Sequence, residues 1–191
     1  MSPHTLISGT DLGAVRGERI LFKGVAVAAR AGELILLRGA NGSGKTTLLR
    51  QLAGLSEPQA GKIERACPHH WIGHTNGLKA HETPRTHLRH WGRVWGSAAD
   101  IDLVLKDMGM ERPANVPCRM LSAGQKRRTA IARIALEARK LWLLDEPFNA
   151  LDTEGQKLLA ERIEAHRAQG GAVIAALHGA APIKADQEVV L

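Results

Sequence analysis

The chain has 191 residues, of which 44% are hydrophobic and 24% are charged, a composition that suits one compact folded domain. It contains no apolar stretch long enough to span a bilayer, and its first residues have neither a basic leader nor an apolar signal core, so we expect no export. The net charge of +7 fits an anionic membrane surface, anionic ligands or nucleic acid. Two phenylalanines and no tyrosine leave little surface for stacking bases, so we favour an anionic inner leaflet, with a solvated basic surface as the alternative.

Residues 5–31 have the pattern of short strands separated by turn residues. The turns are predicted at Asp11–Gly13 and Arg16–Glu18. Gly61–Arg65 has the composition of another short strand that returns to them. We therefore expect an antiparallel β-lobe at the start of the chain.

Residues 39–46 form a complete phosphate-binding loop. Leu34–Arg38 before it is typical of a buried strand, and residues 46–53 after it have a helical pattern. Glycines let consecutive backbone N–H groups converge on a phosphate, the lysine reaches the β- and γ-phosphates, and the helix dipole favours an anion. The predicted nucleotide-binding residues are Gly39, Ala40, Asn41, Gly42, Ser43, Gly44, Lys45, Thr46 and Thr47.

The same loop supplies a metal ligand, because the Thr46 hydroxyl is placed to bind Mg²⁺. The alternative is a glycine-rich turn that matches by chance, and the correct flanking segments argue against it. The loop alone leaves GTPases, kinases and helicases open, so the later segments have to decide between them.

Residues 78–120 are predicted to be helical and irregular, with three prolines as interruptions. Six histidines lie in or near this region: His69, His70, His74, His81, His87 and His90. Their spacing matches no metal motif, so we favour a lobe surface over a metal site. Cys67 and Cys118 are interpreted as incidental thiols in a reducing compartment.

Leu121–Gln125 introduces a helix that continues to about Leu136. Ser122 is predicted to cap it, and the unpaired N–H groups of its first turn form a second anion site. The basic residues 126–128 follow, and we expect a solvated helix face there more than phosphate contacts.

Residues 141–147 read as a buried strand that ends in two carboxylates. Asp145 is predicted to hold Mg²⁺ through water, and Glu146 to polarise the attacking water as a catalytic residue. Residues 172–177 are predicted to form another strand, which delivers His178 to the same edge of the sheet. An amphipathic helix from Asp152 to about residue 169 connects the two and ends at a glycine pair.

Together these segments resemble the ATP-binding cassette (ABC) family. Leu121–Gln125 is similar to its signature sequence, Leu143–Glu146 to its Walker B segment, Asp152 to its D-loop and His178 to its catalytic switch histidine. The resemblance covers essentially the whole chain, residues 1–191, as a single nucleotide-binding domain. It implies an α/β P-loop NTPase fold with a mostly parallel core sheet, an antiparallel β-lobe and a helical lobe inserted at about residues 78–120.

The resemblance also implies ATP and Mg²⁺ as cofactors and a head-to-tail dimer with a second copy of the chain. Each ATP would be bound between Lys45 of one chain and Ser122 and Gly124 of the other, with Asp152 also among the nucleotide-binding residues. One chain then holds half of each site, so hydrolysis requires a dimer whose closing and opening moves attached membrane subunits.

A narrower resemblance is to the haem-exporter cassettes of cytochrome c maturation, carried by residues 71–79, 121–128 and 136–151. It implies permease subunits of the CcmB and CcmC types, a peripheral position on the cytoplasmic side of the inner membrane, and ATP hydrolysis that releases a haem-loaded chaperone. Two other functions stay open: a soluble cassette ATPase that acts on nucleic acid or ribosomes, and a nucleotide sensor that does not hydrolyse ATP.

Two positions depart from the family pattern. The lid glutamine of the family should fall near residue 75, where this chain has Thr75 followed by Asn76. The adenine-stacking tyrosine is replaced by an arginine, Arg16, whose guanidinium plane can stack on a purine or face solvent. Both changes bear on turnover and on nucleotide choice.

Overall fold

The computed structural model describes residues 5–179 and 182–191. The chain divides into two compact units, the first made of residues 1–74, 139–146 and 162–191, and the second of residues 75–138 and 147–161. In the described part of the chain, no helix combines the length and the apolar character that crossing a membrane requires.

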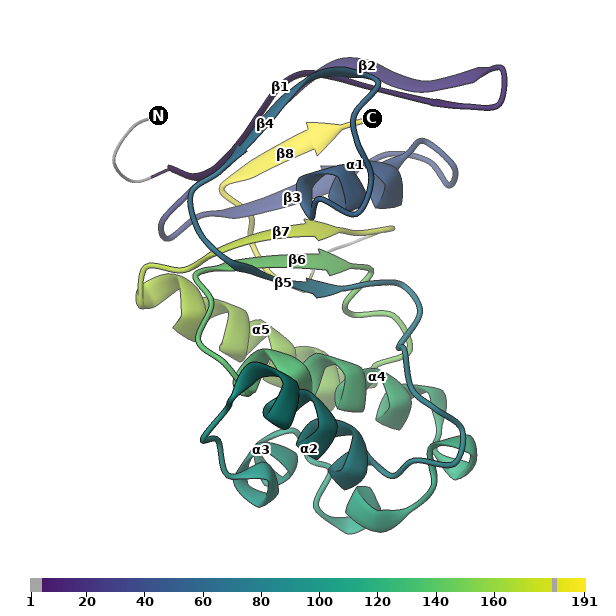
Figure 1. Cartoon of the computed structure of the whole chain (residues 1–191), viewed down its shortest axis with the longest axis vertical. Helices are drawn as coiled ribbons and strands as arrows, with labels where there is room; N and C mark the ends of the chain where they lie inside the picture. Colours follow the sequence, from purple (N-terminus) through teal and green to yellow (C-terminus); the bar gives the residue numbers. More distant parts are fainter. Residues whose placement is uncertain (1–4, 180–181) are drawn as a thin grey trace. The chain divides into compact units, whose positions relative to one another are not determined.

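The first unit contains an antiparallel sheet of three strands in the order β2-β1-β4. The two long strands β1 (Thr5–Arg16) and β2 (Arg19–Arg30) form a hairpin, and β4 (Ala60–Arg65) pairs with the other side of β1. The return of residues 61–65 to this sheet is confirmed. Figure 1 shows the three strands together at the top of the first unit.

The predicted turn at Asp11–Gly13 is wrong. These residues lie inside β1, where the pairing with both neighbouring strands shifts register, and Asp11 has a φ of 54°. An aspartate tolerates this left-handed conformation, so it supports a β-bulge as readily as a turn. Leu12 and Ala14 continue the buried face, which keeps the chain in the sheet.

The second sheet of this unit has five parallel strands in the order β5-β6-β7-β3-β8. The strands are β3 (Leu34–Arg38), β5 (His69–Ile72), β6 (Leu141–Asp145), β7 (Ala172–Ala176) and β8 (Gln187–Val190). All residues of β6 and β7 are buried, as expected for central strands of a parallel sheet. The strands predicted at 34–38, 141–147 and 172–177 are confirmed, and the last two end at residues 145 and 176.

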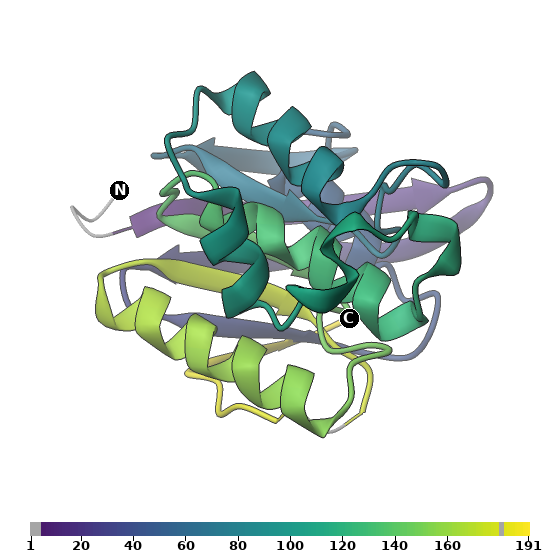
Figure 2. The ribbon, with the colours of Figure 1, turned by 90° about the horizontal axis from the view of Figure 1, so that it is seen from below.

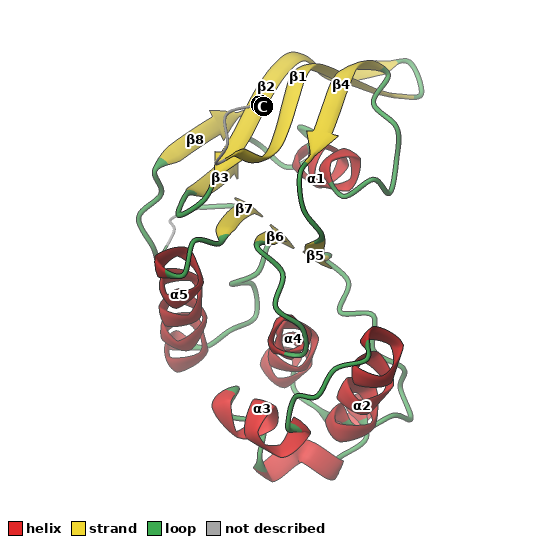
Figure 3. Ribbon diagram, turned by 60° about the vertical axis from the view of Figure 1, so that its left-hand side comes forward, coloured by secondary structure: helices red, strands yellow, loops and turns green. Residues whose placement is uncertain are grey.

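Helix α1 (Lys45–Leu52) packs between the two sheets of the first unit, as Figure 3 shows. Leu48, Leu49 and Leu52 on this helix belong to one buried apolar cluster with residues of both sheets. Arg65 of β4 donates to the carbonyl oxygens of Leu52 at 2.7 Å and of Gln51 at 2.6 Å, which satisfies the end of the helix. Arg65 thereby ties the last turn of α1 to β4.

The second unit is helical (Figure 2). It contains α2 (Pro84–Trp95), α3 (Ile101–Asp107), short 3-10 helices at Arg112–Asn115 and Cys118–Met120, and α4 (Ala123–Ile131), which continues as a 3-10 turn through Ala135. Helix α5 (Thr153–Ala168) begins in this unit and ends in the first. The α/β class is confirmed, whereas the treatment of residues 1–191 as one nucleotide-binding domain stays a prediction.

Candidate active site

The candidate residues of the first unit gather at the carboxyl ends of its parallel strands. The phosphate loop follows β3, Asp145 ends β6 and is followed by Glu146, and His178 lies two residues beyond the end of β7. Neighbouring parallel strands end at the same edge of a sheet, and this edge is where α/β proteins place their ligands. The structure therefore brings these sequence-predicted residues to one edge.

The phosphate loop has the tight curvature that its glycines predict. Gly44, directly before α1, has a φ of 108°, and a Cβ atom there would lie 2.7 Å from the Phe22 ring of β2. Lys45 is 6% exposed, and its Nζ donates to the carbonyl oxygens of Gly39 at 2.7 Å and of Ala40 at 3.0 Å. The lysine thus closes the loop on itself and keeps its ammonium group at the loop.

The loop also leaves groups that fit a phosphate. No side chain caps the start of α1, and the buried Ser43 hydroxyl has no hydrogen-bond partner among the described residues. Unpaired N–H groups at a helix start and a buried hydroxyl without a partner are favourable positions for anionic oxygens. The residues present therefore fit the triphosphate of a nucleotide.

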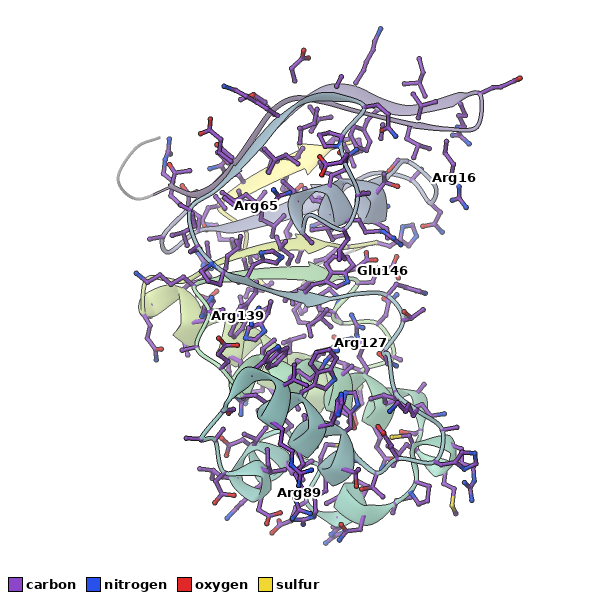
Figure 4. All side chains as sticks on the ribbon, in the orientation of Figure 1. Arg16, Arg65, Arg89, Arg127, Arg139 and Glu146 are labelled. Carbon is purple, nitrogen blue, oxygen red and sulfur yellow. The ribbon has the colours of Figure 1, made fainter. Side chains whose placement is uncertain are left out.

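A hollow of about 180 Å³ lies at this loop. Its lining comes entirely from the first unit: Arg16, Leu21, Asn41, Gly42, Gly44, Lys45, Thr46, Thr47 and Glu146. Figure 4 labels Arg16 beside the β1–β2 hairpin and Glu146 at the end of β6. Arg16 thus lines the same hollow as the phosphate loop, and whether it stacks on a base stays a prediction.

Two oxygen-bearing side chains that suit Mg²⁺ are in contact. The Thr46 hydroxyl donates to the two carboxylate oxygens of Asp145 at 2.9 and 3.2 Å, and Asp145 is 1% exposed. Mg²⁺ prefers hydroxyl, carboxylate and phosphate oxygens and keeps several waters. The pair fits a magnesium ion held between the loop and the end of β6.

Glu146 is held in an unusual backbone conformation, with a φ of 48°. Its N–H donates to the carbonyl oxygen of Ala176 in β7 at 2.9 Å, which fixes the main chain at the edge of the sheet. Its carboxylate lies 3.1 Å from Nδ1 of His74. His178 is exposed, and the preceding Leu177 N–H donates to Leu37 of β3 at 3.2 Å.

In the second unit, Ser122 caps α4 as predicted. Its hydroxyl accepts from the Gln125 N–H at 3.1 Å, while the Gln125 side chain accepts from the Ser122 N–H at 3.0 Å. A Cβ atom on Gly124 would lie 2.8 Å from the Ala150 carbonyl oxygen. Glycine is therefore required where the signature segment meets residues 149–152.

Asp152 acts in this structure as a cap of α5. It accepts from the Gly155 N–H at 2.9 Å and pairs with Arg128 of α4. The Gly155 N–H and then the Arg128 guanidinium hold the pKa of the Asp152 carboxyl below its ordinary value. The interpretation of residues 126–128 as a solvated face is wrong for Arg128, whose side chain is 14% exposed, and for Arg127.

Arg127 is buried, with 3% of its surface exposed (Figure 4). Its Nε donates to the Pro147 carbonyl oxygen and its Nη1 donates to the Asn76 side-chain oxygen, both at 3.3 Å. The segment after Thr75 is thereby tied to the residue that follows Glu146 in the chain. A hollow of about 620 Å³ in the same unit is lined by Thr75, Asn76, Gly77, Leu78, Ala80, Cys118, Arg119 and Lys126.

Sequence reasoning missed the contact of His74 with Glu146 and treated the histidines as one surface group. His70 and His87 are buried, with 2% and 3% exposed. Among the described residues, no group of three His, Cys, Asp or Glu side chains is arranged to hold a metal ion. His74 lies beside Glu146 because β5 pairs with β6, and no sequence motif indicates this pairing.

The fold, the phosphate loop and the carboxylates at the end of β6 are those of a P-loop nucleotide-binding protein. Residues 22–149 match the ABC transporter family, and the chain belongs to this family as one of its ATPase subunits. A solved structure described as the ATP-binding subunit of an ABC transporter has a TM-score of 0.85 at 26% identity, covering 98% of this chain and 86% of that chain. Such subunits bind ATP and work with membrane permease subunits.

Within the family, the chain is of the CcmA cytochrome c biogenesis type. It is 53% identical over 191 residues to the cytochrome c biogenesis ATP-binding export protein CcmA of Hyphomonas neptunium, covering 100% of this chain and 99% of the relative. The CcmA protein of Methylococcus capsulatus is 42% identical, with 92% of each chain covered. Both resemblances drawn from the sequence, to ABC cassettes and to those of cytochrome c maturation, are confirmed.

Proposed function

We propose that this chain hydrolyses Mg·ATP to drive haem export, or the release of a haem-loaded chaperone, in cytochrome c biogenesis. The observation that supports hydrolysis most directly is the contact of Thr46 with Asp145 beside Glu146, which lines the phosphate hollow. A metal position and a carboxylate base then share one site. The assignment of haem as the cargo rests on the similarity of the chain to CcmA proteins, and not on any residue that lines the hollow.

Each residue has a proposed role. Residues 39–47 bind the phosphates through N–H groups and the Lys45 ammonium group. Thr46 and Asp145 hold Mg²⁺, which neutralises charge on the phosphates. Glu146 accepts a proton from the attacking water. His178, beyond the end of β7, is the second catalytic residue and takes the place of the switch histidine of the family.

The second half of the proposed site comes from another copy of the chain. Ser122 and Gly124 begin α4, where the helix start favours an anion, and Ser122 retains its O–H as a donor because its oxygen accepts within the capping box. Asp152, in the same unit, is proposed to contact the nucleotide together with Ser122 and Gly124. The proposed assembly is a head-to-tail dimer on permease subunits of the CcmB and CcmC types, at the cytoplasmic side of the inner membrane.

The role of Glu146 is tested by Glu146→Gln, which keeps the shape of the side chain and removes the base. ATP affinity is expected to stay close to that of the wild type, because Lys45 and the loop amides are untouched. Turnover is expected to fall about a hundredfold or more. A wild-type rate of phosphate release in this variant would refute the assignment.

The dimer is tested by mixing two inactive variants, Lys45→Ala and Ser122→Arg. Each removes a different half of a composite site, so a mixed dimer retains one complete site and should recover part of the wild-type ATPase activity. The two variants separately serve as controls. A rate per chain that stays constant on dilution to monomers would contradict the dimer.

A further inference from the structure

We propose that His74 is a positioning residue for hydrolysis, and that its Nδ1–H group orients the carboxylate of Glu146 toward the attacking water. This inference rests on the proposed role of Glu146. It assigns a function to His74, which lies between β5 and Thr75.

The topology of the sheet places the two residues side by side. Strand β5 pairs in parallel with β6, and the register runs from His69 opposite Leu141 to Ile72 opposite Leu144. When this register is continued beyond both strands, His74 comes level with Glu146. Neighbouring strands lie about 4.8 Å apart, so side chains at level positions are within reach of each other.

The contact has the geometry of a hydrogen bond between an imidazole and a carboxylate. His74 Nδ1 lies 3.1 Å from Glu146 Oε2. An ionised carboxylate can only accept, so the proton of this contact is on Nδ1. One oxygen of the Glu146 carboxylate thus receives a donor from His74, and this bond sets the direction in which the carboxylate faces.

The sheet fixes the main chain of Glu146, and the contact with His74 acts on its side chain. Its N–H is bonded to Ala176, and its φ of 48° sets the direction in which the side chain leaves the backbone. Three side-chain torsions still separate this anchor from the carboxylate. The hydrogen bond from His74 restrains the far end of the side chain, and a general base acts efficiently only when it is held in position.

The expected effect is modest, because the His74 side chain is 65% exposed and that of Glu146 is 20% exposed. Exposed ion pairs and hydrogen bonds of this kind restrain a partner weakly. We expect His74→Ala to lower kcat about twofold to fivefold, with KM for Mg·ATP and ATP affinity little changed.

Conservative variants separate positioning from packing. The side-chain amide nitrogen of asparagine occupies nearly the same place as Nδ1 of histidine, so His74→Asn should restore most of the wild-type kcat. His74→Gln carries its amide one bond further and should resemble His74→Ala. His81→Ala is the matched control, because this exposed histidine contacts Arg119 and lies in the second unit.

The full chain is assayed with Mg·ATP, and every variant is also made in the Glu146→Gln background. There, His74→Ala should cause no additional loss, because the base that it orients is already absent. An unchanged or raised kcat in His74→Ala, an equal loss in His74→Asn, or an equal further loss in the Glu146→Gln background would each overturn the inference. If Glu146→Gln itself kept the wild-type rate, the proposed role of Glu146 would fail instead, which is a separate result.

Discussion

The buried histidine of α2 makes the stability of the chain depend on pH. His87 is 3% exposed, and its Nε2 has no hydrogen-bond partner within the described residues. Burial, followed by the nearby Arg133 guanidinium, lowers the pKa of His87 from 6.5 to about 4, while Glu82 opposes the shift and His90 and Lys79 add to it. The folded protein therefore holds this imidazole neutral under conditions in which the unfolded chain would protonate it.

The sign and size of the effect follow from linkage. Between pH 6.5 and about 4 the unfolded state binds the proton and the folded state does not, so stability is lost as the pH falls through this range. The two pKa values differ by an amount that corresponds to about 3 kcal/mol of unfolding free energy. Most of that loss, about 2 to 3 kcal/mol, should be present at about pH 4.5 relative to pH 7.5.

The variant His87→Phe isolates this contribution, because it keeps a ring next to Trp91, whose centroid lies 6.4 Å away, and it cannot titrate. The free energy of unfolding is measured by urea titration with circular dichroism at several pH values. His69 and His166, whose pKa values burial also lowers, are present in both proteins and cancel in the comparison. An equal loss of stability in the wild type and in His87→Phe between pH 7.5 and 4.5 would refute the reasoning.

Three further predictions concern nucleotide binding, turnover and stability. Gly44→Ala should weaken ATP binding more than Gly42→Ala does. Both glycines have a positive φ, but only at residue 44 would the new methyl group meet the Phe22 ring. Equal ATP affinities of the two variants, measured by isothermal titration calorimetry, would contradict this prediction. Thr75→Gln should raise ATP turnover with little change in affinity, whereas Asn76→Ala should lower the unfolding free energy by about 1.5 kcal/mol because Arg127 loses an acceptor. If Thr75→Gln left turnover unchanged, residue 75 would have no part in hydrolysis. If Asn76→Ala left the unfolding free energy unchanged, the bond from Arg127 to Asn76 would not contribute to stability.

The parts of the fold that the sequence predicts are those in which local chemistry and burial agree. Leu34–Arg38 and Leu141–Asp145 are wholly apolar before their last residue. Short apolar runs of this kind are typical of strands that are buried on both faces of a parallel sheet. Ser122 with Gln125 three residues later specifies a helix start without any tertiary contact. Such local signals locate the candidate site residues along the chain.

The errors arose at charged residues whose role depends on contacts or pairing made elsewhere in the fold. Asp11 looks like a turn residue, yet it allows a bulge within a long strand. Arg127 and Arg128 look like a charged helix face, yet one binds Asn76 and the Pro147 carbonyl and the other binds Asp152. A buried polar side chain is defined by partners distant in the sequence, so composition assigns it to the surface by default.

Lys45 shows how structure adds to a motif that the sequence already specifies. An ammonium group has three donors, and Nζ uses two of them on the Gly39 and Ala40 carbonyl oxygens. These bonds hold the loop closed, and an ammonium group has a third donor that suits a phosphate oxygen. A loop that is ordered by its own hydrogen bonds is preorganised, and preorganisation favours tight binding of a ligand. The same bonds position the lysine within the hollow that Glu146 lines, so the loop that we propose to bind the triphosphate lies beside the proposed base.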